Sequence, residues 1–136
     1  MDDRKCVMVI DGDLPAGVAA NTAAILGVTL GRQVPELVGA DTVDASRRTH
    51  LGIVTVPVAM LRGDAGILKE LRERLYGDEY GDLVTVDFSD AAQGCHVYGE
   101  YREKAASITD FRYLGVAIYG NKKKVNRLTG SMPLLR

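Results

Sequence analysis

The sequence opens with a strand, a tight acidic turn and a helix without charged residues, and this order constrains the fold most strongly. Lys5–Ile10 contains a continuous apolar run of the length expected for a strand covered on both faces. Asp11-Gly12-Asp13 predicts a turn, and Ala16–Leu30 is rich in alanine, as helices are. Pro15 suits the opening turn of that helix and Gly31 its C-cap. A strand, a glycine turn and a helix N-terminus present backbone N–H groups and carboxylates to a ligand, so we expect a functional site here.

The rest of the chain predicts three further strands that alternate with helices. Pro57 cannot donate a hydrogen bond to a neighbouring strand, so we expect its strand at an edge of the sheet. Asp64 is expected to cap the helix that follows, and residues 32–51 to form a long irregular connection. The expected strands are Ile53–Val58, Leu83–Phe88 and Tyr113–Tyr119, and the expected helices are Asp64–Tyr76, Ser89–Ser107 with breaks at Gly94 and Gly99, and Lys122–Leu128.

This alternation predicts one α/β domain over residues 1–136, built around a small and mostly parallel sheet. Hydrophobic residues make up 46% of the chain, yet no apolar run is long enough to cross a bilayer, so we expect no membrane partner. The start, MDDRK, is unlike a secretory signal. Cys6 and Cys95 do not form a C-x-x-C motif, which favours reduced thiols and a cytoplasmic location.

Charge is distributed unevenly along the sequence. The formal net charge is −1, but residues 121–136 hold five basic side chains and no acidic one. An overall basic surface for nucleic acid is absent. Lys122, Lys123 and Lys124 fall in the first turn of the last helix, where cations oppose the helix dipole. They form either an anion-binding site or an ordinary solvated face.

Acidic residues follow two of the predicted strands. Asp11 and Asp13 come after the first strand, and Asp87 and Asp90 lie around the end of the third. If these strands are parallel neighbours, the carboxylates meet at one sheet edge, where they suit general acid–base chemistry or a hard cation. Alternatively, Asp13 and Asp90 cap helices. We assign neither a metal nor a cofactor to the chain.

Two histidines stand apart from any metal-ligand spacing. His50 lies in the long connection and is expected on the surface. His96 and Tyr98 lie in the segment after the third strand, and we expect them to line a pocket. The sequence contains neither a serine-hydrolase elbow nor a phosphate-binding P-loop motif.

Both ends of the chain resemble peptidyl-tRNA hydrolase II proteins, and more specifically a branch of that fold group with unknown function. The opening VMVIDGDLPAGVAANTAA resembles the family's strand, D-L-x-x-G turn and alanine-rich helix. The ending VAIYGNKKKVNRLTGSMPLLR resembles its last strand, short helix and T-G-x-x-x-L-L tail, and Asp90-Ala91-Ala92 stands where the family has D-A-G. The resemblance implies a three-layer α/β/α sandwich with a mixed sheet of about four strands, the last antiparallel and the second at the edge.

The resemblance carries Asp90 over as a catalytic carboxylate and Gly17 as a loop glycine. The family's first loop is rich in lysine (K-x-G-K-G-K), whereas Pro15–Ala20 holds no cation, and an inserted segment of residues 91–112 follows Asp90. Loss of these cations weakens phosphate-driven binding of tRNA and argues against peptidyl-tRNA hydrolysis. The sequence therefore favours a protein that binds a small or nucleotide-type ligand through Asp11, Asp13, Gly17, His96 and Tyr98, with or without hydrolysing it.

Two alternatives remain open. One is a non-enzymatic binding or assembly protein, in which Ala19, Ala23, Gly27 and Gly31 form one smooth helical face that serves as a homodimer surface. The other is a Mg²⁺-dependent phosphatase, because the apolar strand ending in D-x-D resembles haloacid dehalogenase-like enzymes. There Asp11 would be the nucleophile and Asp13 the acid–base residue. Pro15, however, replaces the threonine or valine of that motif.

Overall fold

A four-stranded mixed sheet forms the centre of the molecule in this computed structural model, which describes residues 3–136. Met1 and Asp2, which begin the acidic start noted above, lie outside these residues. The strands are ordered β4-β1-β6-β5. β4 runs parallel to β1, and β6 runs antiparallel to both of its neighbours. The strands are β1 (Arg4–Asp11), β4 (Val58–Gly63), β5 (Val84–Ser89) and β6 (Tyr113–Asn121).

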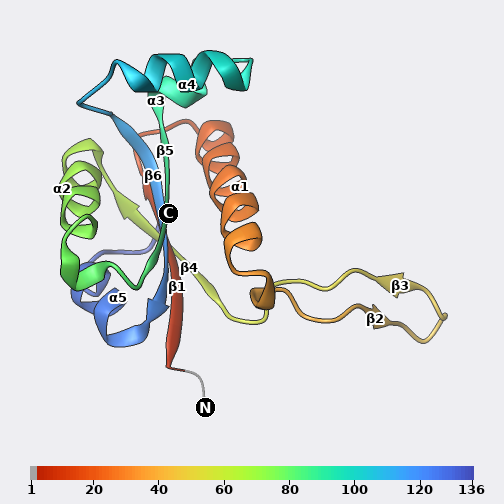
Figure 1. Ribbon diagram of the computed structural model, residues 1–136. Coiled ribbons are helices and arrows are strands. Elements are labelled where there is room, and N and C mark those ends of the chain that lie inside the picture. The colour runs from red at the N-terminus through yellow and green to blue at the C-terminus, as the bar shows by residue number, and fades with distance from the viewer. Residues whose placement is uncertain (1–2) are drawn as a thin grey trace.

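Helices cover both faces of this sheet and make three layers (Figure 1). α1 lies on one face, and α2 and α5 lie on the other. α3 and α4 lie beyond the end of β5, and two 3-10 turns, η1 and η2, connect elements. The bounds are α1 (Ala16–Gln33), α2 (Ala65–Leu75), α3 (Asp90–Gln93), α4 (Tyr98–Ala106), α5 (Lys122–Thr129), η1 (Pro35–Leu37) and η2 (Asp78–Tyr80). The α/β/α sandwich and its antiparallel last strand agree with the expectation from the sequence.

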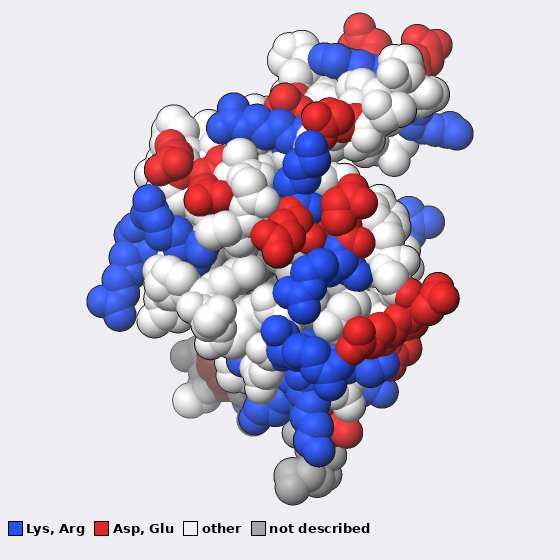
Figure 2. Space-filling view, turned by 90° about the vertical axis from the view of Figure 1, so that its left-hand side faces the viewer, with Lys and Arg blue, Asp and Glu red and all other residues white. Residues whose placement is uncertain are grey.

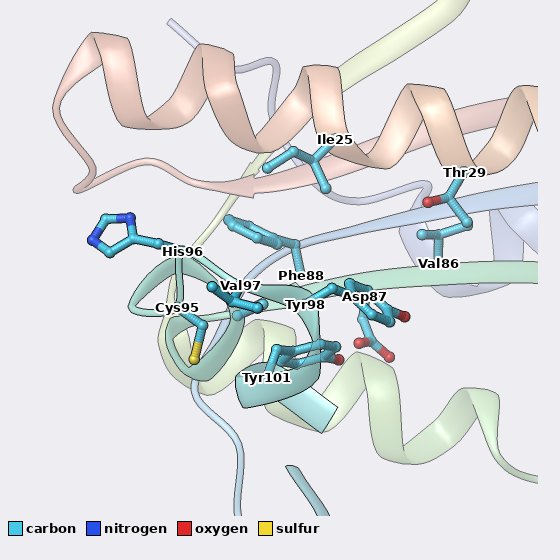
Figure 3. A pocket seen from close by; sticks show the side chains of 11 residues that line it. Ile25, Thr29, Val86, Asp87, Phe88, Cys95, His96, Val97, Tyr98 and Tyr101 are labelled. Carbon is cyan, nitrogen blue, oxygen red and sulfur yellow. The ribbon is translucent and has the colours of Figure 1, made fainter. Parts of the chain in front are cut away.

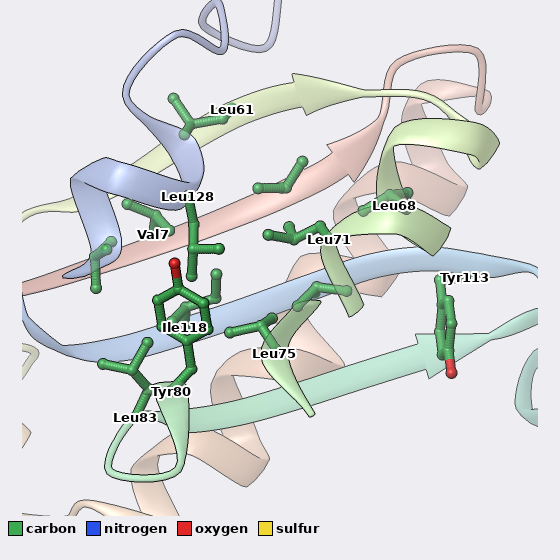
Figure 4. Close-up of a cluster of buried hydrophobic side chains, with 13 residues drawn as sticks. Val7, Leu61, Leu68, Leu71, Leu75, Tyr80, Leu83, Tyr113, Ile118 and Leu128 are labelled. Carbon is green, nitrogen blue, oxygen red and sulfur yellow. The ribbon is translucent and has the colours of Figure 1, made fainter. Parts of the chain in front are cut away.

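The central strand β1 is buried on both faces, because its side chains alternate between two hydrophobic clusters. Val7 and Val9 join the cluster under α2 and α5, which Figure 4 shows, together with Leu68. Met8 and Ile10 join the cluster under α1. This two-sided burial explains why the sequence of β1 is an unbroken apolar run. Ala19 and Ala23 pack against the cluster under α1 and Gly27 lies against Met8, so the helical face expected to be a homodimer surface lies against the sheet instead.

The second strand of the sheet lies at an edge, as expected, but the residues predicted for it are wrong. The strand begins at Val58, where the expected one ends, and pairs in parallel with β1 from Cys6↔Val58 onward. Ile53–Pro57 instead belongs to an extended hairpin that the long connection forms with β2 (Thr42–Val43) and β3 (Thr49–His50). Ile53–Val56 is a run of β-branched residues, whereas Val58–Gly63 has only one, so strand propensity favours the wrong segment and the pairing with β1 overrides it.

Two smaller expectations also need correction. Gly31 is not a C-cap, because α1 continues to Gln33 and the amide of Val34 bonds to the carbonyl of Leu30. The sheet is not mostly parallel, because β6 lies between β1 and β5 and runs against both. Within residues 3–136, no helix combines the length and apolar character that crossing a membrane requires.

Candidate functional site

A cavity of about 460 Å³ lies at the free edge of β5, between α1 and the segment that contains α3 and α4 (Figure 3). β5 pairs with β6 on one side, and on its other side no strand of the described chain covers it. The cavity therefore reaches around the edge of the sheet. Its wall is formed by Ile25, Thr29, Val86, Asp87, Phe88, Ala92, Cys95, His96, Val97, Tyr98 and Tyr101.

Successive side chains of β5 point to opposite faces of the sheet, so the cavity has an apolar side and a polar side. Val86 and Phe88 belong to the hydrophobic cluster under α1 and form the apolar side with Ile25. Asp87 lies between them in the strand and therefore points to the opposite face. There its Oδ2 accepts a hydrogen bond of 2.7 Å from Nε of Arg72 on α2.

Two tyrosines from the beginning of α4 complete the wall. Tyr98 and Tyr101 are three residues apart, so they lie on one face of the helix. Their rings meet edge to face with centroids 5.6 Å apart. Tyr98 is 72% exposed, and burial raises the pKa of Tyr101. The cavity thus offers aromatic surface beside a single carboxylate.

The carboxylate of Asp87 belongs to a larger polar cluster below the cavity. The guanidinium of Arg72 lies 3.8 Å from the centre of the Tyr76 ring, a cation–π contact. Burial, together with the negative charge of Asp87 and a hydrogen bond with Tyr76, raises the pKa of Tyr113 to about 12. Because Arg72 bonds to Oδ2, the other oxygen of Asp87 is left for a hydrogen-bond donor on a ligand.

Asp11 and Asp13 lie away from this cavity. Asp11 is 1% exposed; its Oδ1 accepts a 2.9 Å hydrogen bond from the backbone amide of Asp13, and its Oδ2 lies 3.5 Å from Arg112. Asp13 is exposed and lies 3.5 Å from Arg62. The two carboxylates thus have different partners. Asp11 lines a second hollow of about 400 Å³ between α1 and the C-terminal residues, whereas Gly17 is exposed with open space around it.

Asp90 lies in a third hollow of about 320 Å³, beyond the end of β5. Its backbone amide donates a 3.0 Å hydrogen bond to the carbonyl of Arg112. Within residues 3–136 its carboxylate has no hydrogen bond or ion pair, although Lys69 and Arg112 line the same hollow. Lys69 is paired with Asp110 at 2.7 Å.

The capping alternative for the two aspartates is wrong. The N-caps of α1 and α3 are Pro15 and Ser89, and neither helix has a side-chain cap. Asp64, in contrast, caps α2 as expected, because its Oδ1 accepts a 2.8 Å hydrogen bond from the amide of Ile67.

Only part of the basic charge of α5 is paired. Figure 2 shows Lys and Arg side chains beside acidic ones on the face that α2 and α5 cover. Lys124 bonds to Asp82 at 2.9 Å, and Arg127 pairs with Glu79. Lys122 and Lys123 have no such partner among the described residues, so they are the cations of this group available to an anion.

His50 and His96 lie in different parts of the fold. His50 lies in β3 of the hairpin, on the surface as expected, and its Nε2 lies 2.8 Å from Oδ2 of Asp44. His96 lines the cavity together with Tyr98. Within residues 3–136, no three histidine, cysteine or acidic side chains lie close enough together to hold a metal ion.

The residues predicted for one site are therefore distributed over three separate hollows. His96 and Tyr98 share the cavity at the β5 edge, while Asp11 and Asp90 each line another one. The sequence analysis missed Phe88 and Ile25 as cavity residues. Their apolar character indicates only burial, and the position of β5 at the sheet edge is what opens the cavity beside them.

Comparisons with known proteins show the family and the fold of this chain. No curated protein matches the sequence. A solved structure of a protein of unknown function from Agrobacterium tumefaciens has 18% sequence identity, a TM-score of 0.89 and 98% coverage of both chains. That likeness shows the α/β fold. Residues 4–136 match the sequence profile of a family described as proteins of unknown function, DUF2000. Because this match spans nearly the whole sequence, the chain belongs to the DUF2000 family.

Proposed function

We propose that this protein binds a small aromatic molecule, uncharged or cationic, in the cavity at the β5 edge. The observation that carries the proposal is a cavity of about 460 Å³ whose wall combines aromatic side chains with the carboxylate of Asp87. Ligand sites in proteins are commonly of this size, mostly apolar, with a few polar groups that fix orientation.

The aromatic residues select the shape of the ligand. Phe88 and Ile25 provide an apolar surface on one side, and the rings of Tyr98 and Tyr101 provide an aromatic surface on the other. A planar ring inserted between them makes stacked or edge-to-face contacts. The second hollow, beside Asp11, lacks aromatic side chains and is a poorer fit for such a ligand.

The charge of the wall selects against anions. Asp87 is the one carboxylate of the wall, and no lysine or arginine lines the cavity within the described chain. A phosphate or carboxylate on the ligand would lose its water beside Asp87, and the cavity wall has no cation to pair with it. Among nucleotide-type ligands, this favours a base or nucleoside over a phosphorylated form.

Three probes of the same shape test this selection. Benzamidine, benzyl alcohol and benzoate carry a cationic, a neutral and an anionic group on one ring. We expect benzoate to bind about tenfold more weakly than benzyl alcohol, a difference of about 1.4 kcal/mol. Tyrosine fluorescence measures binding, since the chain has six tyrosines and no tryptophan. Equal affinity for all three probes contradicts the role given to Asp87.

A blocking variant tests the place of binding. Ile25→Trp puts a large ring into the cavity from α1, and we expect it to abolish binding of benzyl alcohol, as measured by calorimetry. Gln33→Trp is the matched control, because Gln33 is exposed at the end of the same helix and does not line the cavity. Unchanged binding by the Ile25→Trp protein would place the ligand elsewhere.

A second candidate function is the hydrolysis that the resemblance to peptidyl-tRNA hydrolase II implies. The free carboxylate of Asp90 supports it, together with the cations Lys69 and Arg112 in the same hollow. These cations come from α2 and from the residue before β6, whereas the family has its lysines in the first loop.

Hydrolysis of peptidyl-tRNA by the wild type and by Asp90→Asn tests this second candidate. This candidate requires turnover by the wild type that is lost in Asp90→Asn and retained in Asp78→Asn, a control at an exposed turn. Absence of turnover by the wild type excludes the activity, and turnover that survives in Asp90→Asn removes the catalytic role of that residue.

A further inference from the structure

Residues 38–57 form a projecting hairpin, here called the arm, that stands away from the body beside the end of α1 (Figure 1). The arm is held together by its own bonds. Near its base, the amides of Gly39 and Thr55 donate to the carbonyls of Ile53 and Leu37, at 2.9 and 2.7 Å. Farther out, the amide of Gly52 donates to Oδ1 of Asp41 at 2.9 Å.

The tip of the arm is fixed in the same way. Oδ1 of Asp44 accepts hydrogen bonds from the amides of Ser46 and Arg48, at 2.8 and 3.0 Å. β2 and β3, which lie before and after this tip, are only two residues each. An isolated two-stranded hairpin is at best marginally stable in water, so this preformed shape needs another surface to maintain it.

The arm exposes apolar side chains that no described part of the chain covers. Every residue from Ala40 to Leu51 is exposed. Leu51 and Ile53 are 80% and 79% exposed, and Val43 is 62% exposed. The segment Leu51–Pro57 contains no charged residue. Large exposed apolar side chains gathered on one segment are typical of a surface that meets a partner.

The outer face of α1 has the same character. Ala16–Gly31 contains no charged residue, although a surface helix normally carries charges on its solvent side. Val28 is 76% exposed on this face, and Ala20 and Ala24 lie exposed along the same line of the helix. These small side chains leave a smooth strip against which another backbone can lie closely.

We propose that the arm of one molecule lies on the outer face of α1 of a second copy, and that the arm of the second copy lies on α1 of the first. Both surfaces belong to one chain and lie on the same side of the sheet, so a twofold axis satisfies both at once (Figure 1). The apolar stretches Leu51–Pro57 and Ala16–Gly31 are both uncharged, and the charged residues of the arm, Asp41, Asp44, Arg47 and Arg48, lie toward its tip. A second copy supplies both apolar stretches at once.

The two surfaces are long enough to take part in an interface of standard size. Interfaces of standard size use about 20–30 residues on each side. The arm spans residues 38–57, and the exposed residues of α1 add to it.

The mass in solution, measured by light scattering during gel filtration, is the first test. We expect twice the chain mass of 14.7 kDa for the wild type. Ile53→Asp on the arm and Val28→Asp on α1 should each give a monomer with an unchanged circular dichroism spectrum. Ile67→Glu, at a residue 40% exposed on the opposite face of the sheet, should stay dimeric. A wild type that is monomeric over a full dilution series overturns the proposal.

Cross-linking between different chains is the second test. One chain carries Val28→Cys and a tagged chain carries Ile53→Cys, both with Cys95→Ser, since Cys6 is buried. A short bismaleimide should join the two kinds of chain into a mixed dimer. A dimer that forms no such cross-link has a different interface, and the arm assignment is then wrong.

Discussion

The close contact between α1 and β6 depends on Gly115, and replacing this residue gives a quantitative test of the packing. A Cβ added at Gly115 would lie 2.7 Å from Cγ2 of Thr22, 2.9 Å from Cδ1 of Ile10 and 3.1 Å from Cδ1 of Leu26. The two Cδ1 atoms are ends of side chains that can rotate. Thr22 cannot, because its χ1 is restricted in a helix and its hydroxyl donates to the carbonyl of Val18 at 2.8 Å.

Gly115→Ala should therefore lower the free energy of unfolding by about 1–2 kcal/mol. Overpacking of a core costs about 1–3 kcal/mol. Replacing glycine with alanine also lowers the conformational entropy of the unfolded chain, and this stabilises the folded state by about 0.4–1 kcal/mol. Urea denaturation measures the difference, provided that the m value is unchanged. Gly31→Ala is the control: it has open space around it within α1, and should stabilise by up to about 1 kcal/mol.

A second substitution isolates the responsible atom. Thr22→Ser removes Cγ2 and keeps the hydroxyl. In this background Gly115→Ala should lower the free energy of unfolding by about 0.5 kcal/mol less, or by a still smaller amount, because contacting residues show coupling free energies of this size. If Gly115→Ala costs the same in both backgrounds, the methyl group of Thr22 is not the obstacle and the packing argument is refuted.

Three other predictions concern stability. The pKa values of Cys6 and Tyr113 are raised to about 11 and about 12 by burial, so the folded state keeps protons that the unfolded state releases above their ordinary values of 9.0 and 10.0. The free energy of unfolding should therefore fall as pH rises from about 9 to 12, by at most about 2–3 kcal/mol for each group. Urea denaturation at a series of pH values measures this loss, and Cys6→Ala should remove the contribution of Cys6. Asp64→Ala should cost about 1 kcal/mol in thermal unfolding, because it removes the cap of α2. Arg72→Met should cost about 1–3 kcal/mol in the same assay, since it leaves the partly buried Asp87 unpaired; an unchanged melting temperature would contradict that pairing.

Elements with a strong local pattern could be predicted from the sequence. The apolar run of β1 indicates a strand buried on both faces, and Asp64 with the periodic leucines after it indicates α2. β4 could not be located in this way. Ile53–Val56 has the stronger strand propensity, and the parallel pairing of Val58–Gly63 with β1 overrides it.

The candidate site was harder to predict because it depends on sheet order. Pairing of β6 between β1 and β5 separates Asp11 from the end of β5 and leaves the far edge of β5 open. His96 and Tyr98 could be proposed as pocket residues, but Phe88 could not be distinguished from any other core residue. The ligand-binding role of these residues remains a prediction.

Mapping of a bound ring by NMR tests the central claim most directly. The protein with labelled methyl and aromatic groups is titrated with benzyl alcohol, and shifts are followed residue by residue. We expect saturable shifts at Ile25, Phe88 and Tyr98, with little change at Met60 and Leu135 beside the second hollow. Saturable shifts at Met60 and Leu135 alone, or no saturable shift anywhere, would contradict the assignment of the cavity at the β5 edge as the ligand site.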